Sequence, residues 1–254
     1  MAFGNDSPFP LSDAFISRFT PRGYMADFLK ARASRSRSFE HYDFNIKALD
    51  TTNIWTVAAG SGATTWAVRA EAGGWIRGVG GASSAVSGLQ LSIPQKYFTG
   101  AAGAGFAALI RLSDISECRL TCGFADALPS VNTKIVNSLV TPTFHTASAG
   151  AMYVYDHTGT TTTTGLFTIG TSSTAAKVAT TTQRFVSATT LFVAVEVNGA
   201  VAQLWVGDVS TPLAVQASAV TPTDGLLPFV EYQQSDGTTS NCDIDAIWHW
   251  SGRV

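Results

Sequence analysis

From about residue 42 onward, apolar and polar residues alternate with a period of two, and turn-forming residues separate the alternating runs. This alternation is typical of strands that bury one face. The clearest run is LFVAVEVNGAVAQLWVGD, residues 191–208. Its central Asn198-Gly199 pair indicates a hairpin, because a type I′ turn requires positive φ at both central positions. The pattern therefore predicts two antiparallel strands joined at these residues.

Folding this hairpin at Asn198-Gly199 separates two faces. One face is wholly apolar, with Val197 opposite Ala200, and we expect it to belong to the core. The other face is mixed and pairs Phe192 with Trp205. Large aromatic rings outside the core can be buried against another subunit or can stack on sugars. We therefore expect Phe192 and Trp205 to form a subunit or scaffold interface, with a glycan-binding face and simple coverage by a loop as the alternatives.

Similar runs recur along the chain, and about a dozen short strands follow residue 40 without a convincing helix. This pattern predicts an all-β fold, an antiparallel jelly-roll β-sandwich. The last run, CDIDAIWHW, is expected to point one set of side chains inward, namely Ile244, Ala246, Trp248 and Trp250. The opposite set is expected to point outward, namely Asp243, Asp245, Ile247 and His249.

The first 41 residues differ from this body and are expected to form an extended, partly helical N-terminal arm, followed by a sandwich domain over 42–254. Two short apolar pieces separated by Pro and Gly cannot build a core alone, so the arm is expected to order on another surface. GYMADFLKAR can form two or three helical turns. The residues predicted to bind a partner are Phe15, Phe19, Tyr24, Phe28, Lys30, Arg32, Arg35 and Arg37.

Charge is sparse and unevenly distributed. Charged residues make up only 13% of the chain and hydrophobic residues 45%. Residues 1–40 carry six cations and four acids, whereas the rest carries ten cations and fourteen acids. An acidic body repels a phosphate backbone, so nucleic-acid binding is not expected. No apolar run reaches the roughly 18 residues of a membrane span, and the N-terminal residues lack the pattern of a secretory signal, so neither a membrane nor secretion is predicted.

Candidate chemistry is weak along the whole chain. Asp243 and Asp245 alternate on the last strand, as carboxylates do in some sandwich glycoside hydrolases, but Trp248 stands where the acid would be. The same stretch could offer oxygen ligands to calcium, although its spacing is not that of an EF-hand and its Asp236-Gly237 pair is more simply a turn. Cys118 and Cys122 lie too far apart along a strand for a disulfide. We predict no enzyme, no metal site and no cofactor.

The body resembles a concanavalin-like or laminin-G-like lectin sandwich in three stretches: FVAVEVNGAVAQLWVGD, FAALIRLSD with CRLTCGFADA, and DIDAIWHW. Phage virion proteins often carry such sandwiches with Thr- and Gly-rich loops, as in HTGTTTTTGLFTIGTSSTAA. The resemblance implies a capsid decoration (cement) protein, synthesised in the host cytoplasm and placed on the virion surface. It would form a trimer whose arm docks on the major capsid protein shell. A carbohydrate-binding tail or fibre module is the alternative.

Overall fold

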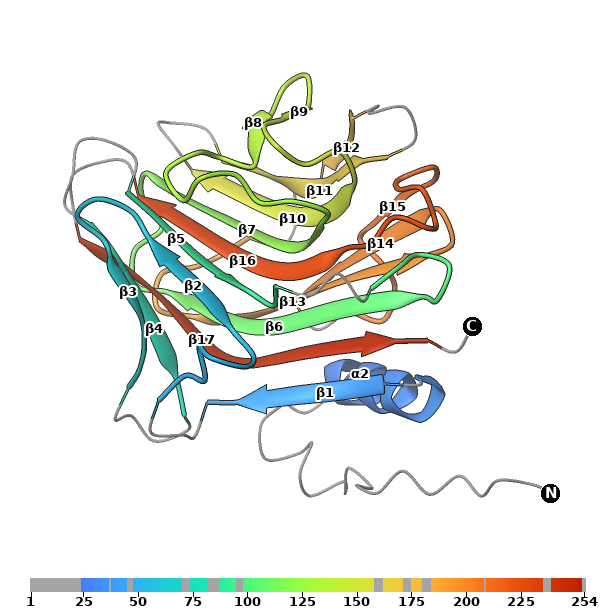
Figure 1. Ribbon diagram of the computed structural model, residues 1–254, viewed down its shortest axis with the longest axis horizontal. Coiled ribbons are helices and arrows are strands. Elements are labelled where there is room, and N and C mark those ends of the chain that lie inside the picture. Colours follow the sequence, from blue (N-terminus) through green and yellow to red (C-terminus); the bar gives the residue numbers. More distant parts are fainter. Residues whose placement is uncertain are drawn as a thin grey trace.

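The computed structural model describes residues 24–252 except for positions 37, 45–47, 70–73, 82–86, 95–97, 158–161, 171–174, 180–183, 208 and 235–238. Two antiparallel sheets pack face to face, which confirms the predicted β-sandwich (Figure 1). Sheet A has eight strands. In spatial order they are β15 (Ala214–Gln216), β14 (Val201–Val206), β13 (Thr190–Asn198), β6 (Ala104–Leu112), β17 (Ser240–Ser251), β4 (Ile76–Gly80) and β3 (Thr64–Val68), with β1 (Ser38–Asp43) paired to β17.

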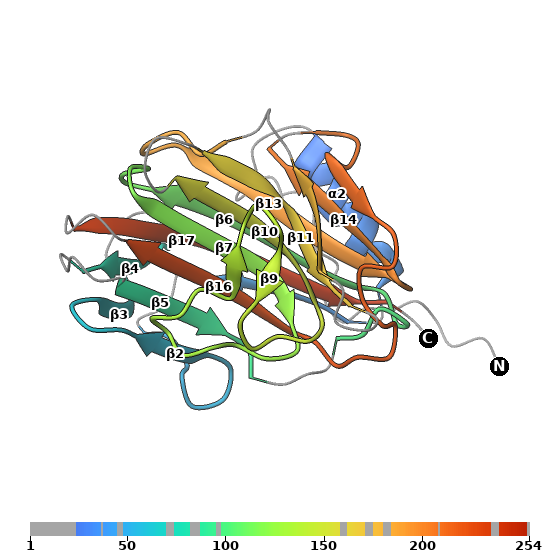
Figure 2. The same ribbon diagram turned by 90° about the horizontal axis from the view of Figure 1, so that it is seen from above.

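Sheet B has seven strands and lies on the other side of the core. In spatial order they are β12 (Ala175–Ala179), β11 (Thr163–Ile169), β10 (Gly150–His157), β7 (Cys118–Ala125), β16 (Leu227–Gln234), β5 (Ser87–Ser92) and β2 (Thr56–Ala59). A small hairpin, β8 (Val136–Ser138) and β9 (Thr143–Phe144), lies over the outer face of sheet B. Figures 1 and 2 place this hairpin and helix α2 on opposite sides of the sandwich.

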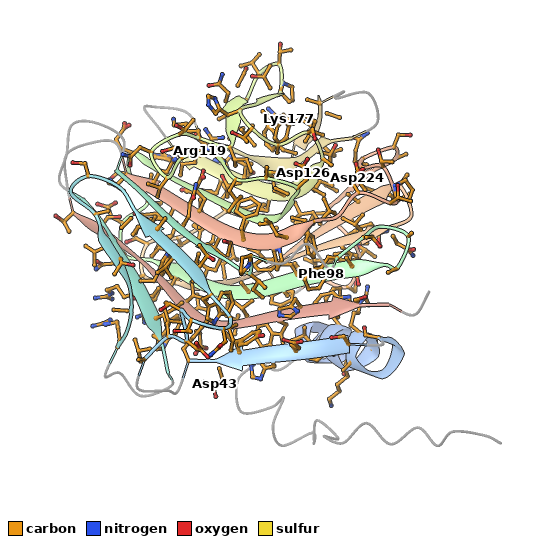
Figure 3. The ribbon with its side chains drawn as sticks, viewed as in Figure 1. Asp43, Phe98, Arg119, Asp126, Lys177 and Asp224 are labelled. Carbon is orange, nitrogen blue, oxygen red and sulfur yellow. The ribbon has the colours of Figure 1, made fainter. Side chains whose placement is uncertain are left out.

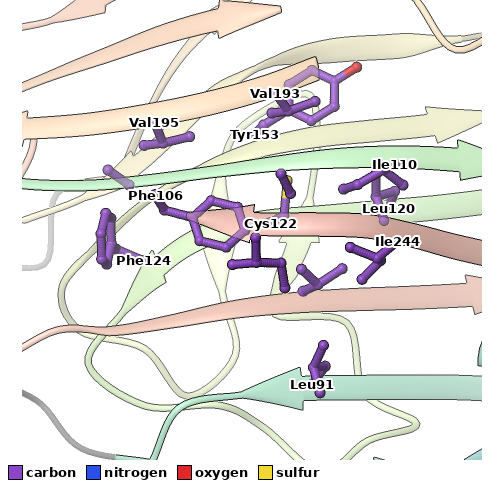
Figure 4. Close-up of a cluster of buried hydrophobic side chains, with 14 of the residues drawn as sticks. Leu91, Phe106, Ile110, Leu120, Cys122, Phe124, Tyr153, Val193, Val195 and Ile244 are labelled. Atoms are coloured by element: carbon purple, nitrogen blue, oxygen red, sulfur yellow. The ribbon is translucent and has the colours of Figure 1, made fainter. Parts of the chain in front are cut away.

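The space between the sheets is filled by the apolar face of each strand, as the alternation predicts. Phe106 and Ile110 of β6 meet Leu120 and Phe124 of β7, and all four are buried (Figure 4). The three cysteines, Cys118, Cys122 and Cys242, are free thiols in this core. The core therefore depends on close packing between the two sheets and includes no disulfide.

The long hairpin forms, but its turn lies one residue later than predicted. Asn198 pairs with Val201, so the turn residues are Gly199 and Ala200. Gly199 has a φ of 58° and Ala200 does not have a positive φ, which matches a type II′ turn with Gly first. The register moves by two residues, so each side chain keeps its predicted face while its partner changes. Trp205 is opposite Ala194, not Phe192.

The last strand differs from the prediction because it contains a β-bulge. The register against β6 shifts between Ile244 and Ala246, so Asp245 is the extra residue. After a bulge the alternation changes phase. Ile247 therefore packs in the core between the sheets, although the unbroken pattern placed it outward. Ala246, Trp248 and Trp250 were expected inward, and they lie on the outer face of sheet A in the cluster with Leu29 of α2. His249 was also expected outward, and it is buried beside Phe98 and Tyr42.

Helix α2 (Tyr24–Arg35) forms within the arm, where a short helix was predicted. Its sequence is rich in Ala, Lys, Arg and Leu, which favour helices, and Asp27 lies in the first turn. The backbone N–H and the hydroxyl of Ser36 both donate to Arg32 O and close its last turn. The arm–body division at residues 41 and 42 stays a prediction, and β1 runs across it. No helix in the described ranges has the length and hydropathy to cross a membrane.

Candidate functional site

Helix α2 covers the outer face of sheet A. Phe28 lies between three aromatic rings of the sheet, with ring centroids 5.0 Å from Trp205, 5.9 Å from Trp250 and 6.0 Å from Phe192. The neighbouring Leu29 is fully buried in the same cluster. Twelve residues are too few for a stable isolated helix. The aromatic face of sheet A therefore supplies the surface on which α2 is stable.

An ion pair between Arg32 and Glu196 also orients α2 on sheet A. Arg32 Nε and Nη2 donate to the two carboxylate oxygens of Glu196 on β13, each at 2.7 Å. The guanidinium carbon also lies 3.9 Å from the centroid of the Phe28 ring. A bidentate Arg–carboxylate pair has one favoured orientation. Arg32 thus fixes the helix on the sheet of its own chain.

The remaining arm residues are placed as follows. Lys30 lies on α2 and is half-buried. Tyr24 and Arg35 are the first and last residues of α2, and their side chains lie outside the described part of the structure. Phe15, Phe19 and Arg37 also lie outside it. Partner binding by the predicted arm residues stays a prediction, while Phe28 and Arg32 have the contacts within the chain given above.

Phe192 and Trp205 were predicted to form an interface or a glycan face. Both come to the outer face of sheet A, but they are only 3% and 5% exposed because α2 lies over them. All six tryptophans of the chain are buried. Among the described residues, the large hydrophobic side chains that are exposed are three valines. With α2 in place, no described tryptophan offers an open ring on which a sugar could stack.

The outer face of sheet B carries a cluster of buried polar side chains. Strand alternation turns them away from the core, and each is at most 7% exposed. We call these residues the sheet B polar cluster: Gln90 of β5, Arg119 and Thr121 of β7, Asp156 of β10, and Glu231 and Gln233 of β16. Figure 3 shows Arg119 on this side, beneath the level of β8 and β9.

Charge in the sheet B polar cluster is nearly balanced. Arg119 Nη1 lies 3.3 Å from Asp156 Oδ2, and both groups are buried. Gln90 Nε2 donates to Glu231 Oε2 at 3.0 Å. Burial raises the pKa of Glu231 to about 7, although the Gln90 hydrogen bond and the Arg119 charge act in the opposite direction. Glu231 therefore changes charge near neutral pH, and the cluster has no large excess of either sign.

Part of the sheet B polar cluster lacks hydrogen-bond partners. Both amide atoms of Gln233 and the hydroxyl of Thr121 are buried without a partner in the described structure. Leaving a buried polar group unpaired costs about 1–3 kcal/mol. Such groups in native proteins usually bind ordered water or a ligand. The cluster thus has free capacity to donate and to accept hydrogen bonds.

The segment 126–149, which contains β8 and β9, covers this cluster. We call it the cover segment. Ile135, Val136 and Ala147 anchor it against apolar residues of sheet B, including Met152 and Phe167. Polar side chains also hold its backbone: Arg119 Nη2 donates to Val136 O at 2.5 Å, and Gln90 Nε2 donates to Pro129 O at 3.2 Å. The cover segment closes the sheet B polar cluster to solvent.

A second charged group surrounds Asp243 on the outer face of sheet A. Arg77 Nε is 2.5 Å from Asp243 Oδ1, and Arg111 Nη2 is 2.7 Å from Oδ2. Burial raises the pKa of Asp243, but the hydrogen bonds from these arginines outweigh burial and leave it below its usual value. Burial, followed by the nearby Asp43 charge, raises the pKa of Asp245 to about 6. Asp243 is thus a structural anion. Within the described residues, no group of three His, Cys, Asp or Glu side chains could hold a metal ion.

No family model and no curated protein matches this chain. Solved structures do match its fold. The carbohydrate recognition domain of Emp47p is 13% identical over 87% of this chain and 98% of that one, with a TM-score of 0.59. A beta-1,3-glucanase from Mycobacterium marinum is 10% identical over 83% and 97%, with a TM-score of 0.56. Peanut lectin, solved with a nine-residue peptide, is 14% identical over 84% and 97%, with a TM-score of 0.55. The chain has a lectin-like β-sandwich fold.

Sequence reasoning missed the sheet B polar cluster. The alternation places Arg119 and Thr121 opposite the core face of β7, so their direction could be read from the sequence. Their burial could not, because it depends on the cover segment, which returns over a sheet face formed by strands distant in sequence. The signal in the sequence was Arg119, a charged residue between the apolar Cys118 and Leu120 in a chain with few charged residues.

Proposed function

We propose that this chain is a non-enzymatic carbohydrate-binding module, and that the sheet B polar cluster is its binding site. The observation that carries this proposal is the unpartnered amide of Gln233, which lies opposite Arg119 in the sheet, together with the Arg119–Asp156 ion pair. Sugar hydroxyls both donate and accept hydrogen bonds, so they suit a site that combines carboxylates, amides and a guanidinium. The fold shared with proteins whose names indicate carbohydrate recognition supports the proposal.

The ligand we propose is a neutral saccharide. Arg119 is balanced by Asp156, and burial raises the pKa of Glu231, which favours its neutral form. An acidic sugar would require an excess of cations, and a basic ligand would require an excess of anions. Since the cluster has neither, hydroxyl groups are the ligand groups that fit it best.

The non-enzymatic part of the proposal rests on the carboxyl groups. Glycoside hydrolases place two carboxyls about 5–9.5 Å apart on either side of the scissile bond. On the described outer face of sheet B, Asp156 is ion-paired with Arg119, and Glu231 receives hydrogen bonds from Gln90 and from Ile135 N. Asp243, on the opposite sheet, is paired with arginines. The Arg119 and Gln90 partners lie on sheet B itself, so Asp156 and Glu231 keep them whether or not the site is covered.

Replacing Gln233 with Leu tests the proposed site. The apolar side chain of similar size removes the free amide, and we expect about fivefold or more weaker binding to saccharides that the wild-type protein binds on a printed glycan array, because a hydrogen bond contributes about 1 kcal/mol. Gln216→Leu is the matched control, since Gln216 lies on β15 of the other sheet and its Nε2 donates to the backbone oxygen of the next residue, Ala217. Equal binding by wild type and Gln233→Leu would contradict the proposed site.

A second candidate function is capsid decoration, and the arm favours it. The chain ahead of α2 contains apolar residues, including Phe9, Phe15 and Phe19, whose ordering requires a surface to bury them. In this proposal the arm docks on the major capsid protein shell, the sandwich forms a trimer on the virion, and synthesis occurs in the host cytoplasm. Quantitative mass spectrometry of purified particles tests it: hundreds of copies per particle support decoration, and absence from particles contradicts it.

A further inference from the structure

The cover segment satisfies hydrogen-bonding groups of the proposed site with its own backbone. Val136 O accepts from Arg119, Pro129 O accepts from Gln90, and Ile135 N donates to Glu231 Oε1 at 3.5 Å. These backbone groups present the sheet B polar cluster with two acceptors and one donor. Saccharide hydroxyls present the same kinds of group.

The cover segment packs too closely against sheet B for a ligand to fit between them. A Cβ added at Gly88 of β5 would lie 1.7 Å from Val131 O, so the segment rests directly on that strand. A Cβ added at Gly60 would lie 1.7 Å from Asn132 Oδ1 and 2.6 Å from Asn132 Cγ. A sugar ring cannot enter at this edge while the segment stays in place.

The two ends of the cover segment are pinned to each other. Asp126 N donates to Ala149 O at 2.9 Å, and Asp126 Oδ1 accepts from Ser148 N at 2.9 Å. These bonds lie where β7 ends and β10 begins, two strands that are hydrogen-bonded to each other throughout. The segment can therefore lift from sheet B without loss of the pairing between β7 and β10.

We propose that the cover segment is an internal competitor of the saccharide: it occupies the sheet B polar cluster in the free protein, and the ligand binds by displacing it. This inference rests on the proposed function and adds its regulation. Displacement exchanges the backbone partners of Arg119, Gln90 and Glu231 for sugar hydroxyls. The observed affinity is then the affinity of the open site reduced by the small fraction of molecules that are open.

A reversible lock tests displacement. The Gly60→Cys, Asn132→Cys pair places two thiols next to each other, because a Cβ at Gly60 would lie against the Asn132 side chain, which the second cysteine replaces with a shorter one. The native cysteines are buried in the core and do not compete. The probe is a printed array of neutral oligosaccharides, applied to the oxidised and the reduced double variant, with Asn132→Cys alone as the control. We expect oxidation to abolish binding and reduction to restore it, while the control is insensitive to both.

A loosened variant provides the opposite change. Ile135→Ala removes an apolar anchor of the cover segment but keeps its backbone and every residue of the sheet B polar cluster. We expect amide hydrogen exchange in residues 130–140 to rise by about tenfold or more, and saccharide affinity to rise with it. Val140→Ser is the matched control, because Val140 is 91% exposed at the tip of the β8–β9 hairpin.

The outcomes separate the inference from the function on which it rests. Loss of binding in the oxidised double variant, together with stronger binding by Ile135→Ala, supports both the displacement inference and the proposed function. Full binding by the oxidised lock overturns displacement but leaves carbohydrate binding intact. If the reduced variant, the wild type and the loosened Ile135→Ala variant all bind no saccharide, the proposed function fails and the inference falls with it.

Discussion

Replacing Arg119 with Met should lower the free energy of unfolding by about 3 kcal/mol, because it leaves Asp156 buried without its cation. Arg119 and Asp156 are 2% and 3% exposed, so water cannot replace the lost partner. Val136 O loses its donor as well, so one of the hydrogen bonds that attach the cover segment to sheet B is lost. Urea denaturation at pH 7 measures the change.

Arg69→Met is the control for this prediction. Arg69 Nη1 lies 3.9 Å from Asp243 and is about one-third exposed, and Asp243 keeps Arg77 and Arg111. We expect a change below about 0.5 kcal/mol, as for most exposed ion pairs. Asp156→Leu added to Arg119→Met should restore much of the lost stability, since removing both charges leaves neither unpaired. Similar losses for Arg119→Met and Arg69→Met would contradict the assignment of a buried pair.

The second large effect is expected at Leu29. Leu29→Ala removes a buried side chain from the contact between α2 and sheet A, at a cost of about 3 kcal/mol. Because α2 is too short to be stable alone, the helix should detach before the sandwich unfolds. Trp205 and Trp250, which Phe28 covers, would then become exposed. Tryptophan fluorescence should shift to longer wavelength, and a protease should cut near Arg35.

Asp27→Asn is the matched control for the helix contact, since Asp27 is exposed in the first turn of α2. Its loss should change stability by less than about 1 kcal/mol, through the helix dipole alone. Unchanged fluorescence and protease resistance in Leu29→Ala would show that α2 does not depend on this contact.

The sandwich was predictable from the sequence, because alternation in strands such as β6, β7 and β13 directly encodes which side chains face the core. Gly199 also marked the hairpin, although the turn position depended on which residue adopts positive φ. The phase of β17 could not be predicted in the same way. Asp245 is an extra residue only with respect to β6, so the bulge exists in the pairing of two strands distant in sequence.

The candidate sites were less predictable for a related reason. Phe192 and Trp205 were correctly assigned to the face away from the core, but alternation cannot indicate that α2 of the same chain covers them. The sheet B polar cluster brings together residues from four strands, and the cover segment buries it. Local pattern gives the direction of a side chain, whereas burial on an outer face depends on long-range contacts.

Helix α2 covers the outer face of sheet A and the cover segment covers that of sheet B, and this changes the interpretation of the arm. The arm was expected to order on another surface, yet its helix orders on sheet A of its own chain through Phe28, Leu29 and Arg32. In the capsid-decoration proposal, the residues ahead of position 24 are then the ones that would bind the partner. The two proposed functions therefore use different regions, with carbohydrate on sheet B and a partner at the N-terminal residues.

The measurement that tests the central claim most directly is amide hydrogen exchange with and without a saturating saccharide identified on the glycan array. The account predicts faster exchange at Ile135 and its neighbours in the cover segment when the saccharide is present, together with slower exchange in β7 and β16, which carry Arg119 and Gln233. Exchange that changes only elsewhere on the sandwich, with the cover segment and sheet B unaffected, would contradict it.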